Sequence, residues 1–317
     1  MLQFRKSDVF DRLKYNTASV QIKEGMHEKK DDNGRRQMRI TESCCACLYD
    51  KQRKRMDDPV YLARVKDLLD NRNENDTSPY MVYCFNNVFT ELYGKKDDYS
   101  EIKKTYNDLV LGMEDQIREE IESSSDPVAK ALVMARIGNY IDFGAMNHVD
   151  NDTFLGLFRN TELSRKDTET YESFLKACAK GRNFLLVCDN CGEIVLDKLL
   201  IEQLSRRFPH LSFKALVRGG DVLNDATAED ARYVGLDRAA KIVPSGVAAA
   251  GTLFPLLSEE AKMAFDEADV ILAKGQGNYE SISGQGFHVF YSLLCKCDLF
   301  TKRFNVPFLT GIFVEEE

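Results

Sequence analysis

The sequence predicts an α/β fold in which a helical N-terminal domain precedes a three-layer domain with a mainly parallel sheet. Two observations predict it. From about residue 170 onward, short apolar runs alternate with amphipathic stretches, a pattern typical of βαβ units because a helix usually fills each parallel crossover. Before that point, apolar residues recur at helical spacing. The chain therefore divides into a charged extension, a helical domain and an α/β domain, at residues 1–40, 41–165 and 166–317.

The first half is predicted to be a helical bundle or cap behind a charged start. Residues up to about 40 are charged and weakly patterned, so we expect little ordered core there. Further on, Tyr61 and Val65 share one face of a helix. Asp126 and Pro127 predict another helix start, because Asp is favoured at the N-cap and Pro in the first turn.

The second half is predicted to alternate strands and helices. The apolar runs predict strands at residues 184–187, 213–217, 242–243, 270–273 and 306–309. The amphipathic stretches between or beside them predict helices at residues 195–204, 261–268 and 287–304.

Composition limits the possible functions. The 317 residues carry a net charge of -8, which disfavours a general nucleic-acid binder because neutralising phosphates needs a surplus of Lys and Arg. We find no apolar run near the roughly 18 to 20 residues that a membrane span needs, and no signal-peptide core at the start. We therefore expect a cytoplasmic protein with neither nucleic acid nor membrane as partner. The oligomeric state is left open.

The nine cysteines are more typical of thiols or metal ligands than of a disulfide framework in a reducing compartment. Cys44 and Cys47 have C-x-x-C spacing, and Cys295 and Cys297 lie far downstream. One such pair is weak support for zinc, because structural sites normally show four clear ligands. Free thiols and a structural metal or redox pair both remain open.

Three polar clusters follow predicted strands directly, at residues 189–193, 218–227 and 274–281. Because the carboxyl ends of parallel strands meet at one edge of a sheet, we expect one crevice to collect them. The alternative is that the Asp-Asn and Asn-Asp pairs only form turns and cap helices, where such residues are enriched. Their occurrence at successive strand ends favours a shared site.

The oxygens of Asp189, Asn190 and Asp225 suit one Mg²⁺ or Mn²⁺, with positions left for water and a substrate phosphate. Lys274 and the backbone N–H groups around Gly275 and Gly277 would hold phosphate oxygens. We assign catalysis to Asp189, Asp225 and Lys274. The substrate side is assigned to eight residues: Asn139, Asp142, Glu193, Arg218, Asn224, Gly275, Gly277 and Asn278.

Several common signatures are missing from the sequence. The glycines at 275 and 277 lack the third glycine of a dinucleotide fingerprint, so a Rossmann dehydrogenase is disfavoured. There is no G-x-x-x-x-G-K-[ST], no G-x-S-x-G and no H-E-x-x-H. The segment 136–144, which carries Asn139 and Asp142, is either a lining of the crevice or only a helix end with an interdomain contact.

Taken together, the clusters Asp189–Glu193, Asn224-Asp225 and Lys274–Glu280 resemble those of the damage-control phosphatase family, long called domain of unknown function eighty-nine. Residues 138–142 extend the resemblance, and the Cys44/Cys47 pair is similar to that of a microbial subgroup. The charged extension departs from the compact start of that subgroup, and the Arg-Thr-x-Lys signature of the eukaryotic branch is absent.

The resemblance implies a helical region packed on a Rossmann-like domain that binds a divalent metal at Asp189, Asn190 and Asp225. It also implies metal-dependent hydrolysis of a small phosphorylated metabolite, a sugar phosphate or a damaged phosphometabolite. Metal-activated water is the expected nucleophile, and a carboxylate nucleophile remains the alternative. Two alternatives are kept. One is an S-adenosylmethionine-dependent carboxyl methyltransferase, an activity also proposed within the family, and the other is a non-catalytic metal-binding protein.

Overall fold

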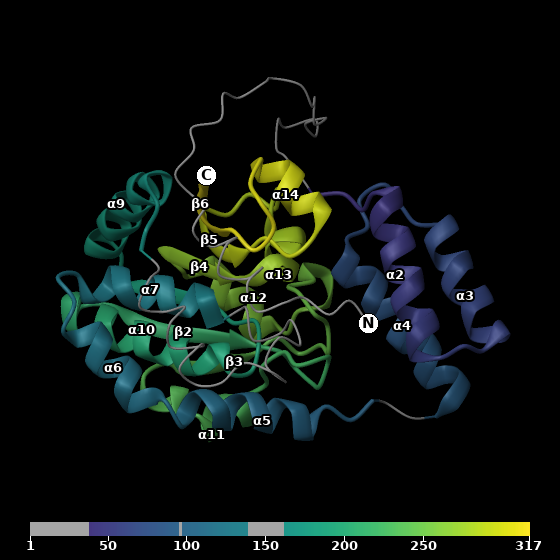
Figure 1. Cartoon of the computed structure of the whole chain (residues 1–317), viewed down its shortest axis with the longest axis horizontal. Helices are drawn as coiled ribbons and strands as arrows, with labels where there is room; N and C mark the ends of the chain where they lie inside the picture. The colour runs from purple at the N-terminus through teal and green to yellow at the C-terminus, as the bar shows by residue number, and fades with distance from the viewer. Residues whose placement is uncertain (1–37, 95–96, 139–161) are drawn as a thin grey trace, which may run out of the picture. The chain divides into compact units, whose positions relative to one another are not determined.

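The computed structural model describes residues 38–94, 97–138 and 162–317 (Figure 1). The described residues all belong to one compact unit. The helices described before the sheet are α2 (Glu42–Arg55), α3 (Pro59–Asp70), α4 (Ser78–Tyr93), α5 (Ser100–Leu111), α6 (Glu114–Glu122), α7 (Pro127–Gly138) and α9 (Arg165–Lys180). As predicted, α7 begins at Pro127, and Asp126 accepts a hydrogen bond from the N–H of Ala129 in its first turn.

One sheet of mostly parallel strands forms the centre of the fold. Its strands are β1 (Asn183–Val187), β2 (Ser212–Val217), β3 (Lys241–Pro244), β4 (Val270–Lys274), β5 (Val289–Leu294) and β6 (Gly311–Glu316). Their order is β3-β2-β1-β4-β5-β6, and all pairs are parallel except β5 with β6. The helices along this half are α10 (Glu193–Arg207), α11 (Ala228–Tyr233), η3 (Leu236–Arg238), η4 (Phe254–Leu256), α12 (Glu259–Asp266), α13 (Gly275–Ile282) and α14 (Asp298–Phe304). The predicted α/β class with a mainly parallel sheet is confirmed.

Each face of the sheet is covered by its own hydrophobic core. On β1, Phe184 and Leu186 belong to a core with α7, α9 and α10, whereas Leu185 and Val187 belong to a core with α12, α13 and α14. This split follows from the alternation of side chains along a strand. Because both faces of β1 and β4 are buried, these central strands are nearly continuous apolar runs, which is why the sequence shows them clearly.

Helices α2, α3 and α4 pack side by side around a separate hydrophobic cluster that includes Tyr61 and Phe85 (Figure 1). Ile117 and Ile121 of α6 and the apolar residues of α7 belong instead to the core shared with the sheet. The predicted boundary near residue 165 stays a prediction.

Two predicted elements near the C-terminus are wrong. Residues 287–304 were expected to form one helix, but residues 289–294 are β5 and only 298–304 are helical. The run Val289–Leu294 is rich in β-favouring residues and fully buried, so its apolar side chains carry no helical face. Residues 306–309 form a turn, not a strand, because Pro307 lacks an N–H and Leu309 has a φ of 62°. The edge strand β6 follows this turn.

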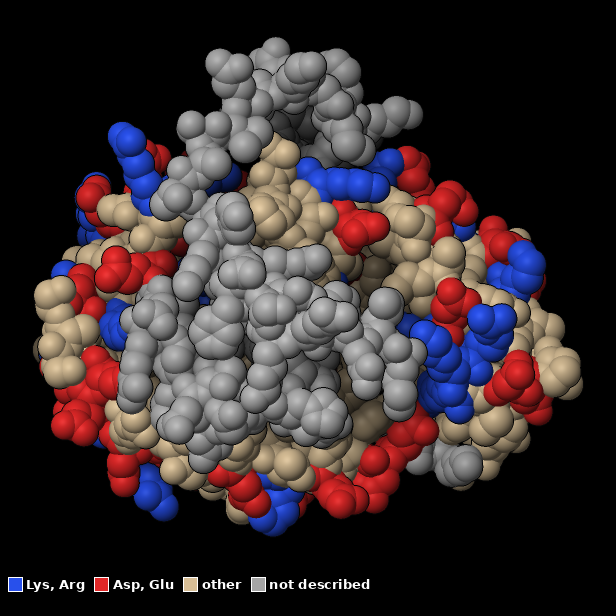
Figure 2. Space-filling view, in the orientation of Figure 1, with Lys and Arg blue, Asp and Glu red and all other residues tan. Residues whose placement is uncertain are grey.

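No helix among the described residues combines the length and apolar character needed to cross a membrane. Acidic and basic side chains are interspersed over the described part of the face shown in Figure 2.

Candidate functional site

The polar clusters meet beyond the carboxyl ends of β1, β2 and β4. In the strand order, β1 lies between β2 and β4, so the chain moves toward one edge of the sheet after β1 and toward the other after β4. Loops diverge at such a point and leave a crevice where α/β proteins bind ligands. Asp189 follows β1, Arg218 and Asp225 follow β2, and Gly275 follows β4.

A pocket of about 160 Å³ lies at this crevice. The residues lining it are Asp189, Asn190, Leu223, Asn224, Asp225, Ala250, Gln276, Gly277 and Lys296. The three predicted metal ligands, Asp189, Asn190 and Asp225, therefore line one pocket. Two of the predicted substrate-side residues, Asn224 and Gly277, line it as well.

The loops after β1 and β2 are joined by their backbones. The N–H of Cys191 donates to the carbonyl of Asn224 and the N–H of Ala226 donates to the carbonyl of Asp189, both at 2.8 Å. Asn190 and Asp225 form an isolated antiparallel bridge. This pairing holds two segments that lie more than thirty residues apart in sequence at a fixed separation.

Gly275 makes room for the Asp189 carboxylate. Its φ is 78°, and a Cβ there would lie 1.9 Å from Asp189 Oδ2. Glycine adopts this left-handed conformation readily and leaves the space that the carboxylate needs. Close approach of β4 to Asp189 thus depends on the absence of a side chain at position 275.

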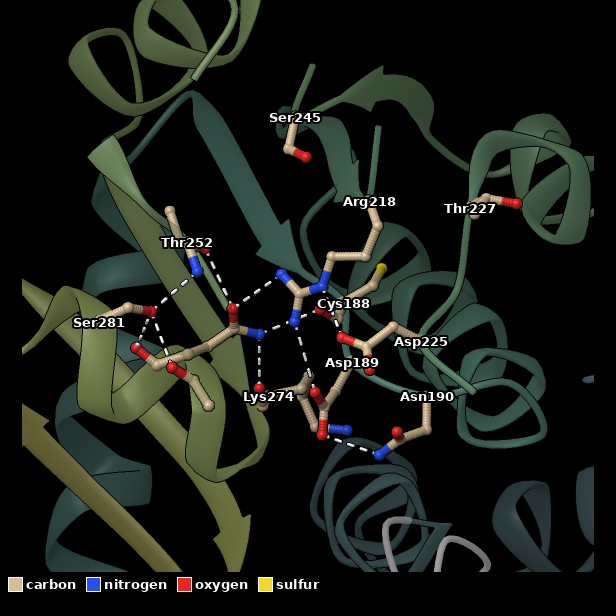
Figure 3. A network of polar contacts seen from close by, with 12 residues as sticks. Cys188, Asp189, Asn190, Arg218, Asp225, Thr227, Ser245, Thr252, Lys274 and Ser281 are labelled. Carbon is tan, nitrogen blue, oxygen red and sulfur yellow. Dashed lines mark hydrogen bonds and ion pairs between the residues drawn. The ribbon is translucent and has the colours of Figure 1, made fainter. Parts of the chain in front are cut away.

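Arg218 is the central cation of the site (Figure 3). Its side chain is 1% exposed, and Nε donates to Asp225 Oδ2 at 2.6 Å. Its two terminal nitrogens donate to Asn278 Oδ1 at 3.0 Å and to Asp189 Oδ1 at 3.4 Å. The planar guanidinium therefore holds both carboxylates in place from its buried position. This buried position gives Arg218 a structural role toward the carboxylates, whereas the sequence had placed it on the substrate side.

Asn278 is buried in the same network and does not line the pocket. Its amide nitrogen donates to the carbonyls of Cys188 and Lys274 at 3.0 and 2.7 Å. Its oxygen accepts from Arg218 and from the Thr252 hydroxyl. The geometry ties Asn278 to the ends of β1 and β4, where the sequence had assigned it to substrate.

Lys274 is the last residue of β4 and is fully buried, away from the pocket lining. Its ammonium donates to Glu193 Oε1 at 2.6 Å, to Asp197 Oδ1 at 2.7 Å and to the carbonyl of Ala135 at 3.1 Å. These three bonds use the three donors of an ammonium group. Lys274 and Glu193 are therefore not among the residues that line the pocket. The sequence had predicted that Lys274 contacts phosphate and that Glu193 lies on the substrate side.

The carboxylates here are electrostatically crowded. Burial raises the pKa of Asp189 well above its usual range, and the nearby Asp225 and Glu193 raise it further against the opposing attraction of Arg218 and Lys296. Burial also raises the pKa of Asp197 to about 7, with Lys274 acting in the opposite direction. A divalent cation beside Asp189 and Asp225 would relieve the repulsion between them.

The pocket also contains donors suited to an anion. Asn224 Nδ2 is buried and has no hydrogen-bond partner among the described residues. The first turn of α13, Gly275-Gln276-Gly277, has no side-chain cap, and backbone N–H groups of a first helical turn lack partners within the helix. Lys296 supplies a half-buried cation to the same lining.

Side chains of helix α5 contact the loop that follows β1. Asn107 Oδ1 accepts the N–H of Gly192 at 2.7 Å, where the backbone has a φ of 78°. Lys103, which is almost fully buried, binds Asp221 at 2.6 Å and Asp230 at 2.7 Å. These contacts connect α5 to the segments that carry the first two polar clusters.

The donor set fits Mg²⁺ or Mn²⁺. Asp189, Asn190 and Asp225 offer only oxygens from two carboxylates and an amide, and these ions prefer oxygen ligands and retain several waters. Within the described ranges, no group of three or more His, Cys, Asp and Glu side chains is arranged to hold a metal. A metal at this pocket would therefore depend on the Asn190 amide and on water or substrate oxygens.

The remaining predicted residues have separate outcomes. Asn139 and Asp142 lie outside the described residues. Cys47 is exposed, Cys44 and Cys297 are half-buried and Cys295 is buried, and all four are free thiols.

Sequence reasoning missed Lys296 of the pocket lining and the supporting residues Asp197 and Asn107, and it gave no role to the lining residues Leu223, Ala250 and Gln276. Lys296 was inside the wrongly predicted helix, and Asp197 and Asn107 were not singled out. Glu193 and Asp197 have i, i+4 spacing, which places two carboxylates on one face of α10 and could have identified them as partners of a buried cation.

Comparison with known proteins gives consistent matches. Residues 20–307 match the model of the damage-control phosphatase ARMT1-like domain. A damage-control phosphatase from Archaeoglobus fulgidus is 30% identical over 282 residues, which is 85% of this chain and 96% of that protein. The damage-control phosphatase PH1575 from Pyrococcus horikoshii is 30% identical over 227 residues, covering 69% of this chain and 76% of that one.

A solved structure agrees with the fold. The crystal structure of a DUF89 family protein from Pyrococcus horikoshii aligns with a TM-score of 0.71 and 24% identity, covering 88% of this chain and all of that one. The family model spans nearly the whole described region, including all three polar clusters. The chain therefore belongs to the damage-control phosphatase ARMT1-like family.

Proposed function

We propose that this chain is a metal-dependent phosphatase that hydrolyses a small phosphorylated metabolite. The observation that carries the proposal is the pocket at the ends of β1, β2 and β4, where Asp189, Asn190 and Asp225 face the same space as Lys296. Such a pocket combines oxygen ligands for a cation with a cation for a phosphate. The names of the relatives from Archaeoglobus fulgidus and Pyrococcus horikoshii support the same reaction class.

In this account Asp189, Asn190 and Asp225 hold Mg²⁺ or Mn²⁺. Such an ion, when bound, supplies Lewis-acid polarisation of a phosphoryl oxygen and lowers the pKa of bound water. Arg218 keeps the two carboxylates oriented, since it bonds both from a buried position. The geometry of the cation site is thus preset by the protein.

The substrate phosphate would contact Lys296, the Asn224 amide and the N–H groups of the first turn of α13. Each of these donors lies at the pocket lining or at the start of α13. They would bind the phosphoryl oxygens and stabilise the charge that develops on them during hydrolysis. Lys274 acts as a positioning residue, because it binds Glu193 and Asp197 and its neighbour Gly275 packs on Asp189.

The size of the pocket favours a small substrate. At about 160 Å³ it accommodates a phosphate group and part of a small organic body. Leu223 lines it with a φ of 48° and is 43% exposed, so an apolar side chain lies where the rest of the substrate would extend. The sugar phosphates and damaged phosphometabolites implied by the family resemblance are of this class.

Hydrolysis of p-nitrophenyl phosphate, measured with EDTA, Mg²⁺ and Mn²⁺ in turn, tests the proposal. The wild-type chain should be stimulated by at least one of the two ions, and Asp189→Ala should remove that stimulation. Asp266→Ala, which removes an exposed carboxylate from α12, is the matched control and should retain it. Metal-stimulated turnover that is undiminished in Asp189→Ala would show that the assignment is wrong.

The methyltransferase alternative has its own test. S-adenosylmethionine should leave the melting temperature unchanged if the phosphatase assignment is correct, whereas Mn²⁺ with inorganic phosphate should raise it, because a ligand that binds the folded state stabilises it.

A further inference from the structure

A second and larger cavity lies away from the catalytic pocket. Its volume is about 690 Å³, and its lining comes from the end of α5, from α6, from α10 between Lys198 and Arg206, and from the segment that runs from the end of α11 to Ala239. The volume falls within the range of small-molecule sites, roughly 300 to 1,000 Å³. The five basic residues of the lining are Arg118, Lys198, Arg206, Arg232 and Arg238, against the two acidic residues Glu114 and Glu202.

The two carboxylates of this lining are already paired with cations. Lys198 binds Glu114 Oε2 at 2.8 Å and also donates to the carbonyl of Val234. Arg118 binds Glu114 Oε1 at 2.8 Å and forms a further ion pair with Glu202. Two cations and two carboxylates therefore balance each other.

Three guanidinium groups remain beyond this balanced set. Arg206 pairs with Glu122 at 2.5 Å, and both side chains are exposed. Arg232 and Arg238 are exposed, and their side chains form no ion pair or hydrogen bond with any other residue that the structure describes. The cavity thus carries a surplus of positive charge, although the whole chain has a net charge of -8.

We infer that this cavity is a binding site for a small organic phosphate of about nucleotide size. Guanidinium groups bind phosphate oxygens through paired N–H donors, and Arg232 and Arg238 supply two such groups. The ring of Tyr233 and the side chain of Leu111, also in the lining, offer apolar surface for the organic body. The inference does not rest on the proposed catalytic function.

A simpler explanation applies to some of these arginines individually. Arg206 and Arg232 lie in the last turns of α10 and α11, where a cation interacts favourably with the carbonyl end of the helix. That explanation accounts for a small gain in stability and predicts no ligand. It also gives no reason for a cavity of this size with Arg206, Arg232 and Arg238 all in its lining.

The site is distinct from the catalytic pocket and shares no lining residue with it. Helix α10 lines the cavity from Lys198, in its second turn, to Arg206, in its last turn. With a rise of about 1.5 Å per residue, these positions lie about 8 to 20 Å along the helix from Glu193. Because the two linings have no residue in common, binding at each can be tested with variants that leave the other lining intact.

Calorimetric titration with ADP in buffer containing EDTA tests the inference. The double variant Arg232→Ala/Arg238→Ala should bind ADP at least tenfold more weakly than the wild-type chain. Arg165→Ala/Arg182→Ala is the matched control, because it removes two exposed arginines and the same charge elsewhere and should bind ADP as the wild type does. Citrate, which carries carboxylates but no phosphate, should bind more weakly than ADP.

Hydrolysis of p-nitrophenyl phosphate by Arg232→Ala/Arg238→Ala should equal that of the wild type, which also shows that the variant is folded. Three results would overturn the inference: the absence of saturable ADP binding, equal ADP affinity in the variant and the wild type, or tighter binding of citrate than of ADP. Loss of catalysis in Asp189→Ala bears only on the proposed phosphatase function, so the two failures are distinguishable.

Discussion

Gly275 and Asp189 are in such close contact that no side chain can replace the glycine hydrogen. A Cβ at position 275 would lie 1.9 Å from Asp189 Oδ2 and 2.3 Å from Cγ. The contact joins the end of β4 to the carboxylate that follows β1, and it fixes where that carboxylate meets the pocket. The position of the Asp189 carboxylate and the start of α13 therefore depend on one another.

Gly275→Ala should lower metal-stimulated hydrolysis at least tenfold, because the new methyl group must displace Asp189. Gly235→Ala is the control: its φ is 77°, close to that of Gly275, but nothing lies within 4 Å of a Cβ there. It should cost about 1 to 2 kcal/mol of stability from backbone strain and leave the rate unchanged. Equal rates in the two variants would show that the contact does not position Asp189.

Arg218→Met should destabilise the fold by about 3 to 5 kcal/mol, because it leaves the buried Asp225 and the partly buried Asp189 without their shared cation. Mn²⁺ should restore part of this loss if the two carboxylates hold the ion. Urea denaturation with EDTA and with Mn²⁺ measures both effects, and Arg182→Met serves as an exposed control. A variant as stable as the wild type in EDTA would contradict the structural role of Arg218.

Lys296 and Lys274 should respond differently to substitution. Lys296→Met should raise KM for p-nitrophenyl phosphate about tenfold or more with little change in stability, since the side chain lines the pocket and is half-buried. Lys274→Met should lower stability by about 3 to 5 kcal/mol, because Glu193 and Asp197 would lose a fully buried partner. Steady-state kinetics and urea denaturation of both variants separate the two roles. A raised KM in Lys274→Met together with a loss of stability in Lys296→Met would instead assign phosphate binding to Lys274.

Asp197 should contribute a loss of stability as pH rises between about pH 4 and pH 7. Its pKa is raised from 3.8 to about 7 in the folded chain, so within this window the folded state keeps a proton that the unfolded state has released. Unfolding then releases a proton, and the free energy of unfolding decreases by at most about 1.4 kcal/mol per pH unit from this group. Urea denaturation across the window should show a shallower decline in Asp197→Asn than in the wild type, and an identical decline in both would refute the assignment.

The sequence was sufficient for the central strands β1 and β4, which are buried and appear as nearly continuous apolar runs, and for β2, whose apolar run 213–217 is interrupted by Lys214. It was insufficient for β5, because its five apolar residues and Ser292, followed by the mixed segment 295–300, gave no period by which to separate strand from helix. The strand β6 was missed for a related reason. The apolar residues around Pro307 predicted a strand, but the residues that pair with β5 come after this turn.

The position of the site was predictable, but the direction of its side chains was less so. Residues after parallel strands meet at one edge, which placed Asp189, Asn190 and Asp225 correctly around one pocket. Lys274 was expected there too. Alternation along β4 places it on the same face as Val270 and Leu272, which pack in the core shared with α7 and α10.

The most direct test of the account is Mn²⁺ binding followed by electron paramagnetic resonance, with inorganic phosphate added to detect coupling of the bound ion to phosphorus. The wild-type chain should bind one Mn²⁺ that shows this coupling, Asp189→Asn and Asp225→Asn should each weaken binding of the ion at least tenfold, and Asp266→Asn should leave it unchanged. Mn²⁺ affinity that is the same in Asp189→Asn, Asp225→Asn and the wild type would contradict a metal centre at this pocket.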